Sequence, residues 1–213
     1  MSTQVQAFCF NGFQENTYVV YNGNDAVIID PGCYAKEEES ALKAFISSTG
    51  LTVHAILFTH AHIDHILGAH FCFETFTSKA YLHPSDHATW EAVERYADVY
   101  GFHGYKPATL PSDFLEDQQI LQFGALQFKV FFTPGHAPGH VVFYHEEGFV
   151  INGDVLFKGS FGRVDLPGGD LEILKNSIQN VLFKFPDQTL VYCGHGPTTT
   201  IGQEKLTNYI LQF

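Results

Sequence analysis

Six residues, His60-Ala-His-Ile-Asp-His65, place four metal-capable side chains directly after the apolar run Ala55-Ile-Leu-Phe-Thr59. The apolar run predicts a buried strand, so three imidazoles and a carboxylate should lie at its carboxyl end. Buried polar and charged groups destabilise a fold unless something compensates them. A divalent cation supplies that compensation, because imidazole and carboxylate both bind transition metals. The segment therefore predicts a metal site at the carboxyl end of a buried strand.

Three later positions extend this site: His136 in Thr133-Pro-Gly-His136, Asp154 in Asn152-Gly-Asp154, and His195 after Gly194. Small or turn-forming residues flank each one, which lets the backbone and a metal come close. One ion rarely takes seven protein ligands, so the set favours two metals with a shared ligand. The predicted ligands are His60, His62, Asp64, His65, His136, Asp154 and His195.

Spacing limits what each residue in the first cluster can do. His60 and His62 are two apart, so in an extended segment both project to the same side and can chelate one ion. Asp64 and His65 follow a change of direction and could face a second ion. Mixed nitrogen and oxygen ligands suit zinc, iron and manganese, and we expect zinc first with iron or manganese as alternatives.

Each of these residues also has a structural interpretation. A single histidine among twelve is more often a hydrogen-bonded structural residue than a ligand. Asp64 precedes an apolar series and could cap a helix. The remaining histidines keep the structural interpretation, and His140 is the best candidate for orienting a ligand.

The chain of 213 residues fits one domain spanning residues 1–213. Hairpins dominate its start and strand–helix alternation dominates the rest, which predicts an α/β fold with two sheets and helices packed outside. We expect strands at 5–10, 17–21, 26–30, 53–58, 80–82, 126–132, 141–145, 149–151 and 190–193, and helices at 35–48, 85–100, 170–185 and 203–211.

The charge balance argues against several partners. The formal net charge is −12 and no Lys/Arg run is present, so we expect no nucleic-acid partner. No apolar run approaches about 18 residues, so we expect no membrane span. The four cysteines form no CxxC pair and no signal peptide precedes them, which predicts reduced thiols in a cytoplasmic protein. Nothing in the sequence indicates the oligomeric state.

Five segments together resemble the metallo-β-lactamase superfamily: Asp30-Pro-Gly32, the HxHxDH of 60–65, Thr133-Pro-Gly-His136, Gly153-Asp154 and Gly194-His195. They occur in that family's order along nearly the whole chain. The resemblance implies a four-layer αββα sandwich with a dinuclear site at one edge. It implies a first metal on His60, His62 and His136, a second on Asp64, His65 and His195, Asp154 between them, and Asp30 in a supporting position.

Within the superfamily, residues 153–170 and Gly194-His-Gly-Pro-Thr198 most resemble single-domain relatives of glyoxalase II. That resemblance implies hydrolysis of a small thioester, S-acylglutathione or a similar acyl-thiol, by a hydroxide that bridges two metals. Asp64 and Asp154 would position this hydroxide. Two-domain glyoxalase II enzymes grip glutathione with a helical C-terminal domain, whereas only 18 residues follow His195 here. The resemblance therefore supports thioester hydrolysis more strongly than it supports glutathione as the thiol.

Other functions stay open. The Gly162-Arg-Val-Asp165 stretch also resembles persulfide dioxygenases, in which a single iron would use His60, His136 and Asp154. A β-lactamase and an RNA-cutting enzyme fit less well. A non-catalytic metal-binding module is the alternative from a different class, and filled ligand positions argue against it.

Arg163 is the best candidate for a substrate contact, since a guanidinium suits a carboxylate, although an ion pair with Asp165 explains it equally well. The Gly- and Pro-rich segment 100–113 predicts a loop that covers the site. Its aromatic residues Tyr100, Phe102 and Tyr105 could line the entrance to the site, or could simply pack the loop.

Overall fold

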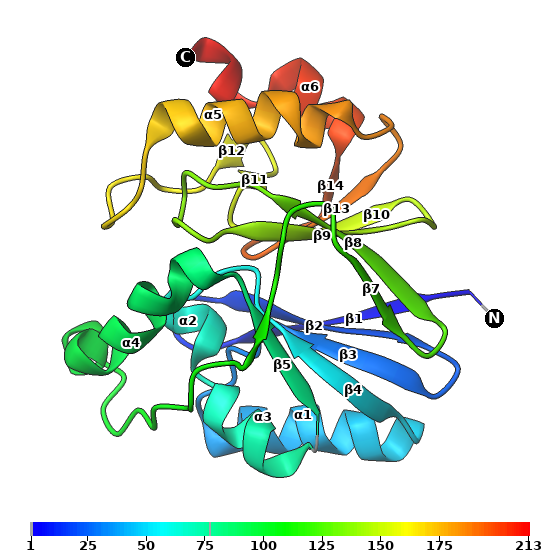
Figure 1. Cartoon of the computed structure of the whole chain (residues 1–213), viewed down its shortest axis with the longest axis vertical. Helices are drawn as coiled ribbons and strands as arrows, with labels where there is room; N and C mark the ends of the chain where they lie inside the picture. The colour runs from blue at the N-terminus through cyan, green and yellow to red at the C-terminus, as the bar shows by residue number, and fades with distance from the viewer. Residues whose placement is uncertain (1, 77) are drawn as a thin grey trace.

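The computed structural model describes residues 2–76 and 78–213, which form two six-stranded sheets and a short two-stranded one. In the first sheet the strands lie side by side in chain order (Figure 1). The first three pair antiparallel and the rest pair parallel. These strands are β1 (Gln4–Phe10), β2 (Glu15–Asn22), β3 (Asp25–Ile29), β4 (Thr52–Leu57), β5 (Lys79–Leu82) and β6 (Asp113–Phe114).

The second sheet is antiparallel except where β10 pairs parallel with β13. Its strands, in spatial order, are β14 (Thr199–Thr200), β13 (Leu190–Cys193), β10 (Phe149–Gly153), β9 (Val141–His145), β8 (Leu126–Phe132) and β7 (Ile120–Phe123). A small hairpin of β11 (Leu156–Phe157) and β12 (Ser160–Phe161) follows β10.

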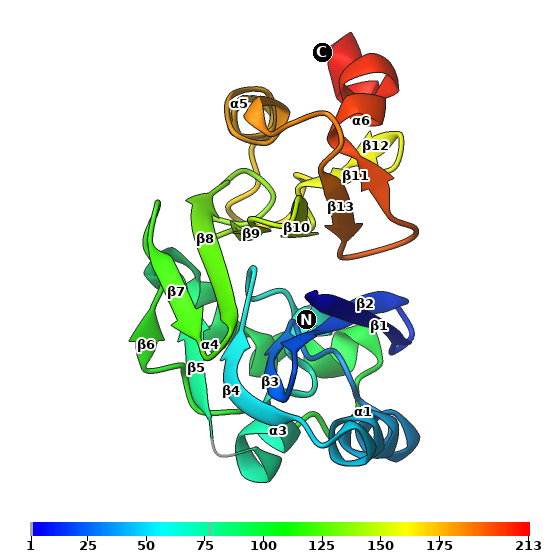
Figure 2. The ribbon, with the colours of Figure 1, turned by 90° about the vertical axis from the view of Figure 1, so that its right-hand side faces the viewer.

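Helices cover the outer faces of both sheets, and the two sheets face each other (Figure 2). Helices α1 (Lys36–Thr49) and α3 (Ala69–Thr75) lie outside the first sheet, and α5 (Leu171–Asn180) and α6 (Ile201–Thr207) lie outside the second. Helices α2 (Ile63–Ile66) and α4 (His87–Tyr96) lie at one end of the sheets. The predicted four-layer αββα sandwich is confirmed.

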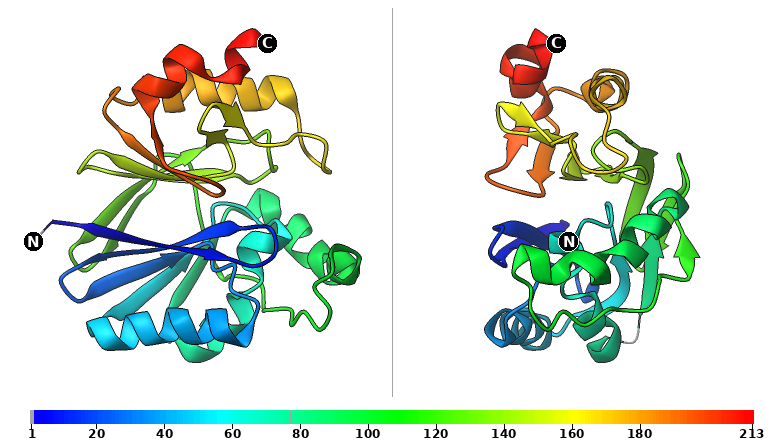
Figure 3. Two further views of the ribbon diagram at one scale, coloured as in Figure 1. Left: turned by 180° about the vertical axis from the view of Figure 1, so that it is seen from behind. Right: turned by 90° about the vertical axis from the view of Figure 1, so that its left-hand side faces the viewer.

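Four short 3-10 turns complete the described elements: η1 (Pro84–Asp86), η2 (Ala97–Tyr100), η3 (Leu182–Lys184) and η4 (Tyr209–Gln212). In Figure 3 the green segment of α4 and η2 lies at one end of the sandwich. No helix in the ranges 2–76 and 78–213 has the length and apolarity needed to cross a membrane.

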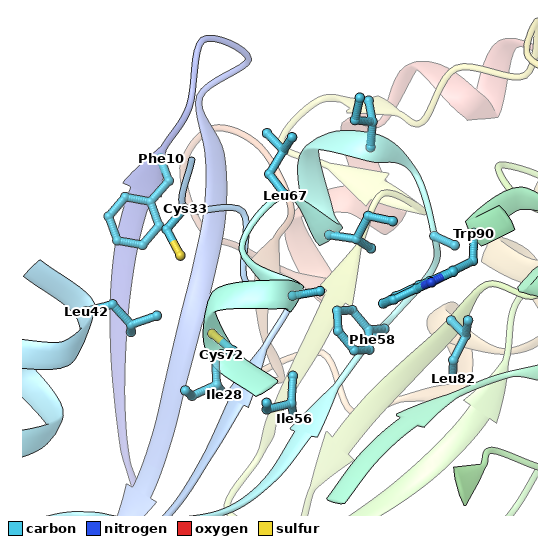
Figure 4. Packing of buried hydrophobic residues seen from close by; sticks show 14 of the residues in the cluster. Phe10, Ile28, Cys33, Leu42, Ile56, Phe58, Leu67, Cys72, Leu82 and Trp90 are labelled. Carbon is cyan, nitrogen blue, oxygen red and sulfur yellow. The ribbon is translucent and has the colours of Figure 1, made fainter. Parts of the chain in front are cut away.

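Strand periodicity explains how the layers hold together. Successive side chains of a strand point to opposite faces, so β3 contributes side chains to two hydrophobic cores. Ile28 packs outward with Leu42 of α1 and Cys72 of α3 (Figure 4). Val27 points inward and packs with Phe128 of the opposite sheet. The near-continuous apolar run of β3 is thus the signature of a strand buried on both faces.

Several short elements, among them β6, β7, β11, β12, β14 and α3, were not predicted from the sequence, and some helix boundaries differ. Strand β7 was not predicted, because its four residues give too short an alternation to identify. Helix α5 ends at Asn180 rather than 185, because residues 182–184 form the 3-10 turn η3 instead. Phe185 is extended before Pro186 and ends that turn. Helix α6 begins at Ile201 rather than 203, where Thr200 accepts a hydrogen bond from the Gln203 amide.

Candidate metal centre

The candidate ligands come from the ends of four strands and meet at one end of the sandwich. His60 and His62 follow β4, and Asp64 and His65 lie in the single turn of α2. The other three come from the second sheet: His136 follows β8, Asp154 follows β10, and His195 follows β13. Because β10 and β13 are parallel, their carboxyl ends lie together and deliver the last two side by side.

Three histidines form the first donor group, which is buried. His136 Nε2 lies 3.2 Å from His60 Nε2 and 2.8 Å from His62 Nδ1. One donor atom from each of the three lies within 4.8 Å of the others. Nitrogen atoms bound tetrahedrally to one zinc at 2.0–2.1 Å would be about 3.4 Å apart, so this spacing fits a single ion.

Asp64, His65 and His195 form the second donor group. Asp64 Oδ2 lies 3.0 Å from His195 Nε2 and 3.7 Å from His65 Nε2. The alternative role of Asp64 as a helix cap is not what the structure shows, because α2 begins after His62 and no side chain caps it.

Asp154 lies between the two groups. Its Oδ2 is 3.7 Å from His136 Nε2 of the first group and 3.4 Å from His195 Nε2 of the second. Its Oδ1 is 3.4 Å from His65 Nε2. A carboxylate with one oxygen facing both groups has the geometry that a shared ligand needs.

Two buried atoms at this point have no hydrogen-bond partner among the described residues: His65 Nε2 and Asp154 Oδ1. Leaving such atoms unpaired costs free energy, and natural proteins rarely do so. The two atoms face each other across 3.4 Å, the separation expected of two ligands on one ion. The residues present therefore fit a divalent metal.

Backbone and carboxylate acceptors orient three of the rings. His136 Nδ1–H donates to the Arg163 carbonyl at 2.8 Å, and His195 Nδ1–H donates to the Phe13 carbonyl at 3.1 Å. His65 Nδ1–H donates to Asp30 Oδ2 at 3.1 Å. In each ring the other nitrogen points into the donor group, where it can bind a metal once it is deprotonated.

A chain of hydrogen bonds orients His60 in the same way. The Thr59 hydroxyl donates to Asp30 Oδ2 at 2.5 Å, so it accepts from His60 Nδ1–H at 3.0 Å. Asp30 Oδ1 also accepts from the Thr59 amide at 2.7 Å. Since these contacts occupy both Asp30 oxygens, Asp30 supports His60 and His65 rather than offering a free ligand atom, the position expected from the sequence.

His140 lies behind the donor groups, where a supporting role was predicted. The Asp154 amide donates to His140 Nε2 at 3.1 Å, and His140 Nδ1 lies 3.2 Å from the Thr133 hydroxyl.

Gly153 has φ +51°, and a Cβ there would lie 2.4 Å from Thr59 Oγ1. This position needs glycine, since both the backbone conformation and the close approach exclude a side chain.

The two donor groups differ in their protonation. Burial, together with neighbouring histidines, lowers the pKa of His60 and brings that of His62 to about 3, so both rings are neutral near pH 7. Burial also opposes charge on His195, but hydrogen bonds to Asp154 and Asp64 raise its pKa to about 9. Metal binding at the second group must therefore release protons.

Asp86 is a residue that the sequence did not single out. Its buried carboxylate accepts from the Ala61 amide at 2.8 Å and from the Gly139 amide at 2.7 Å. It thus ties the segment of His60 and His62 to the segment of His136. Burial raises the pKa of Asp86 to about 6, with the two amides partly offsetting that rise.

A cavity of about 1030 Å³ opens beside the donor groups. Five of the seven candidate ligands line it: His62, Asp64, His136, Asp154 and His195. Tyr100 also lines it, as expected, and is 40% exposed. Phe102 does not line it and is buried against Phe13 and Tyr34, because a loop aromatic with apolar neighbours packs inward. Tyr105 likewise packs against the core, so loop packing explains both.

Arg163 lines the same cavity, but its guanidinium is engaged by Asp165. Its Nε and Nη2 donate to the two carboxylate oxygens of Asp165, each at 2.7 Å. Of the two interpretations that the sequence left open, the structure shows the ion pair.

Comparison with known proteins agrees with the fold. The chain is 38% identical over 200 residues to the probable metallo-hydrolase YqgX of Bacillus subtilis, covering 93% of this chain and 92% of that protein. It is 36% identical over 207 residues to the hydroxyacylglutathione hydrolase GloC of Haemophilus influenzae, covering 93% of each.

Solved structures match nearly the whole chain as well. The B3 metallo-beta-lactamase BLEG-1 superposes with a TM-score of 0.90 at 38% identity, over 99% of this chain and 100% of that one. TTHA1623 in a di-iron-bound form superposes with a TM-score of 0.86 at 41% identity, over 96% of this chain and 99% of that one. ETHE1 from Myxococcus xanthus superposes with a TM-score of 0.78 at 25% identity, over 97% of this chain and 83% of that one. The sequence profile of the Metallo-beta-lactamase superfamily matches residues 10–195. The chain therefore belongs to the metallo-β-lactamase superfamily.

Proposed function

We propose that this protein is a dinuclear metal-dependent hydrolase of a small acyl thioester. One observation carries the proposal: six donors form two groups, and Asp154 lies between them with Oδ2 near both. The unpaired Asp154 Oδ1 faces the unpaired His65 Nε2. His60, His62 and His136 would hold one ion, and Asp64, His65 and His195 the other. The relationship to the hydroxyacylglutathione hydrolase GloC supports this reaction class.

Bound divalent metals would supply a water of lowered pKa and a positive charge that polarises the substrate carbonyl. The chain's own groups would position the reactants. Asp154 Oδ1 and the Asp64 carboxylate can accept hydrogen bonds from the reacting water and so fix its orientation. A substrate bound in the cavity would lie against five of the candidate ligands. Neither a serine nor a cysteine nucleophile is needed for this chemistry.

Zinc is the metal we propose first, and iron remains the alternative because the similar structure of TTHA1623 holds two irons. The four cysteines are free and three of them are buried, which supports a reducing compartment such as the cytoplasm.

A second candidate is a mononuclear-iron persulfide dioxygenase. His60, His136 and Asp154 favour it, because His136 Nε2 lies 3.2 Å from His60 Nε2 and 3.7 Å from Asp154 Oδ2. Two imidazoles and one carboxylate around one point are a typical non-haem iron set. The second donor group would then have no function, which is why we favour the hydrolase.

The deciding experiment combines elemental analysis with two activity assays on the purified protein. Lactoylglutathione and a panel of other thioesters are tested for hydrolysis, and glutathione persulfide is tested for oxygen uptake. The proposal predicts two metals per chain and thioester hydrolysis that the double substitution His60→Ala and Asp154→Ala abolishes. One iron with oxygen uptake would support the dioxygenase instead. Full metal content without either activity would favour a non-catalytic metal-binding module.

A further inference from the structure

The walls of the cavity beside the donor groups are mostly apolar. Ala88, Ala92 and Val99, from α4 and η2, line one side. Phe161 of β12 and Leu166, which follows that strand, are among the other lining side chains. At about 1030 Å³ the space is at the upper end of typical small-molecule sites. It is larger than a lactoyl group requires.

Lysine and arginine side chains supply almost no free positive charge to the cavity. Among the described lining residues, Arg163 is the one lysine or arginine. Asp165 occupies both its Nε and its Nη2, so the pair is locally neutral. The hydrogen bond from Arg163 lowers the pKa of Asp165 to about 2, so the carboxylate is ionised near neutral pH. Asp165 thereby competes with any substrate carboxylate for the guanidinium.

This lining suits some thioesters and not others. Glutathione carries two carboxylates and an ammonium group, and charged groups that enter a largely apolar space need partners. An apolar acyl chain gains free energy there, because its surface leaves water.

Resting on the proposed function, we propose that the preferred substrate is a thioester with an apolar acyl chain of several carbons and an uncharged thiol arm. Ala92 leaves room for the acyl chain, and Asp165 holds Arg163 away from carboxylates. The reaction balances as a hydrolysis: a C–O bond forms to water and the C–S bond breaks. The acid and the free thiol are the products, and a proton from water ends on the sulfur.

The first test varies chain length. The kcat/KM of the metal-loaded enzyme is measured on acetyl, butyryl and hexanoyl esters of N-acetylcysteamine, and calorimetry measures the Kd of the matching non-hydrolysable S-alkyl thioethers. We expect affinity to rise about three- to fourfold per methylene. Ala92→Phe should abolish this rise, so that the thioether Kd values no longer depend on chain length. Glu91→Phe is the matched control, since Glu91 is exposed on α4 and outside the cavity lining.

The second test varies charge. Asp165→Asn should raise kcat/KM on lactoylglutathione by about two- to fivefold, the range set by an exposed ion pair, and leave the hexanoyl ester unchanged. Adding Arg163→Gln should remove that gain.

Three outcomes would overturn the inference: thioether Kd values independent of chain length, lactoylglutathione hydrolysed more efficiently than the hexanoyl ester, or a tenfold loss on lactoylglutathione from Arg163→Gln alone. Failure of the metal-loaded enzyme on every thioester would contradict the proposed function instead, and the thioether Kd values separate the two cases.

Discussion

Asp86 should make the stability of the metal-free protein depend on pH in a specific way. Burial raises the pKa of its carboxyl from 3.8 to about 6 in the folded state. The folded chain therefore binds this proton more tightly than the unfolded chain. Asp86 favours folding most when protonated, and stability is lost as pH rises from about 4 towards the folded pKa.

The size of this effect follows from the same values. A pKa that rises from 3.8 to about 6 corresponds to about 3 kcal/mol in total. About 2 kcal/mol of this falls between pH 4.5 and pH 7.5. Asp86→Asn cannot ionise, so the stability of this variant relative to wild type should improve by about 2 kcal/mol across that window. Other titrating groups are common to both proteins and cancel in the difference.

The assay is urea unfolding of both proteins in excess chelator at several pH values, followed by circular dichroism. Asp86→Ala serves as a second variant, because it leaves the Ala61 and Gly139 amides without a partner and should cost about 2–5 kcal/mol. A stability difference between wild type and Asp86→Asn that stays flat across the pH range would refute the reasoning. It would show that the carboxyl ionises as it does in water.

Three other perturbations follow from the contacts around the donor groups. Thr59→Val removes the hydroxyl between His60 and Asp30. Metal affinity measured by chelator competition should therefore fall about 10- to 100-fold. An unchanged affinity would exclude the orienting role of this hydroxyl. Gly162→Ala should lower stability by about 1–3 kcal/mol in urea unfolding, since its Cβ would lie 1.8 Å from the Asp154 carbonyl oxygen; wild-type stability would contradict the close packing. The free energy of unfolding should be about 4 kcal/mol lower in chelator than with free metal at a thousand times its Kd. An unshifted Tm in differential scanning calorimetry would mean that folding and metal binding are uncoupled.

The sequence predicted those parts of the site whose signals are local. His60 to His65 form one short motif, and the turn residues before His136, Asp154 and His195 mark strand ends. The four-layer arrangement followed from hairpins at the start of the chain and strand–helix alternation after them, together with the family resemblance.

Features that depend on long-range packing were not predictable in the same way. Asp86 acts on backbone amides 25 and 53 residues away, and no motif marks such a contact. The sequence left open whether Phe102 lines the cavity entrance or packs in the loop. Which of the two occurs depends on neighbours such as Phe13, which the chain brings close only on folding. The choice between a substrate contact and an ion pair for Arg163 likewise required the position of Asp165.

The central claim is that two donor groups sharing Asp154 each hold a metal ion, and metal content tests it most directly. Wild-type protein saturated with zinc, iron or manganese and freed of excess metal should contain two ions per chain by elemental analysis. His60→Ala and His195→Ala should each retain about one, since each removes a ligand from a different group. A correctly folded wild-type chain that retains no metal, or never more than one ion, would contradict the claim.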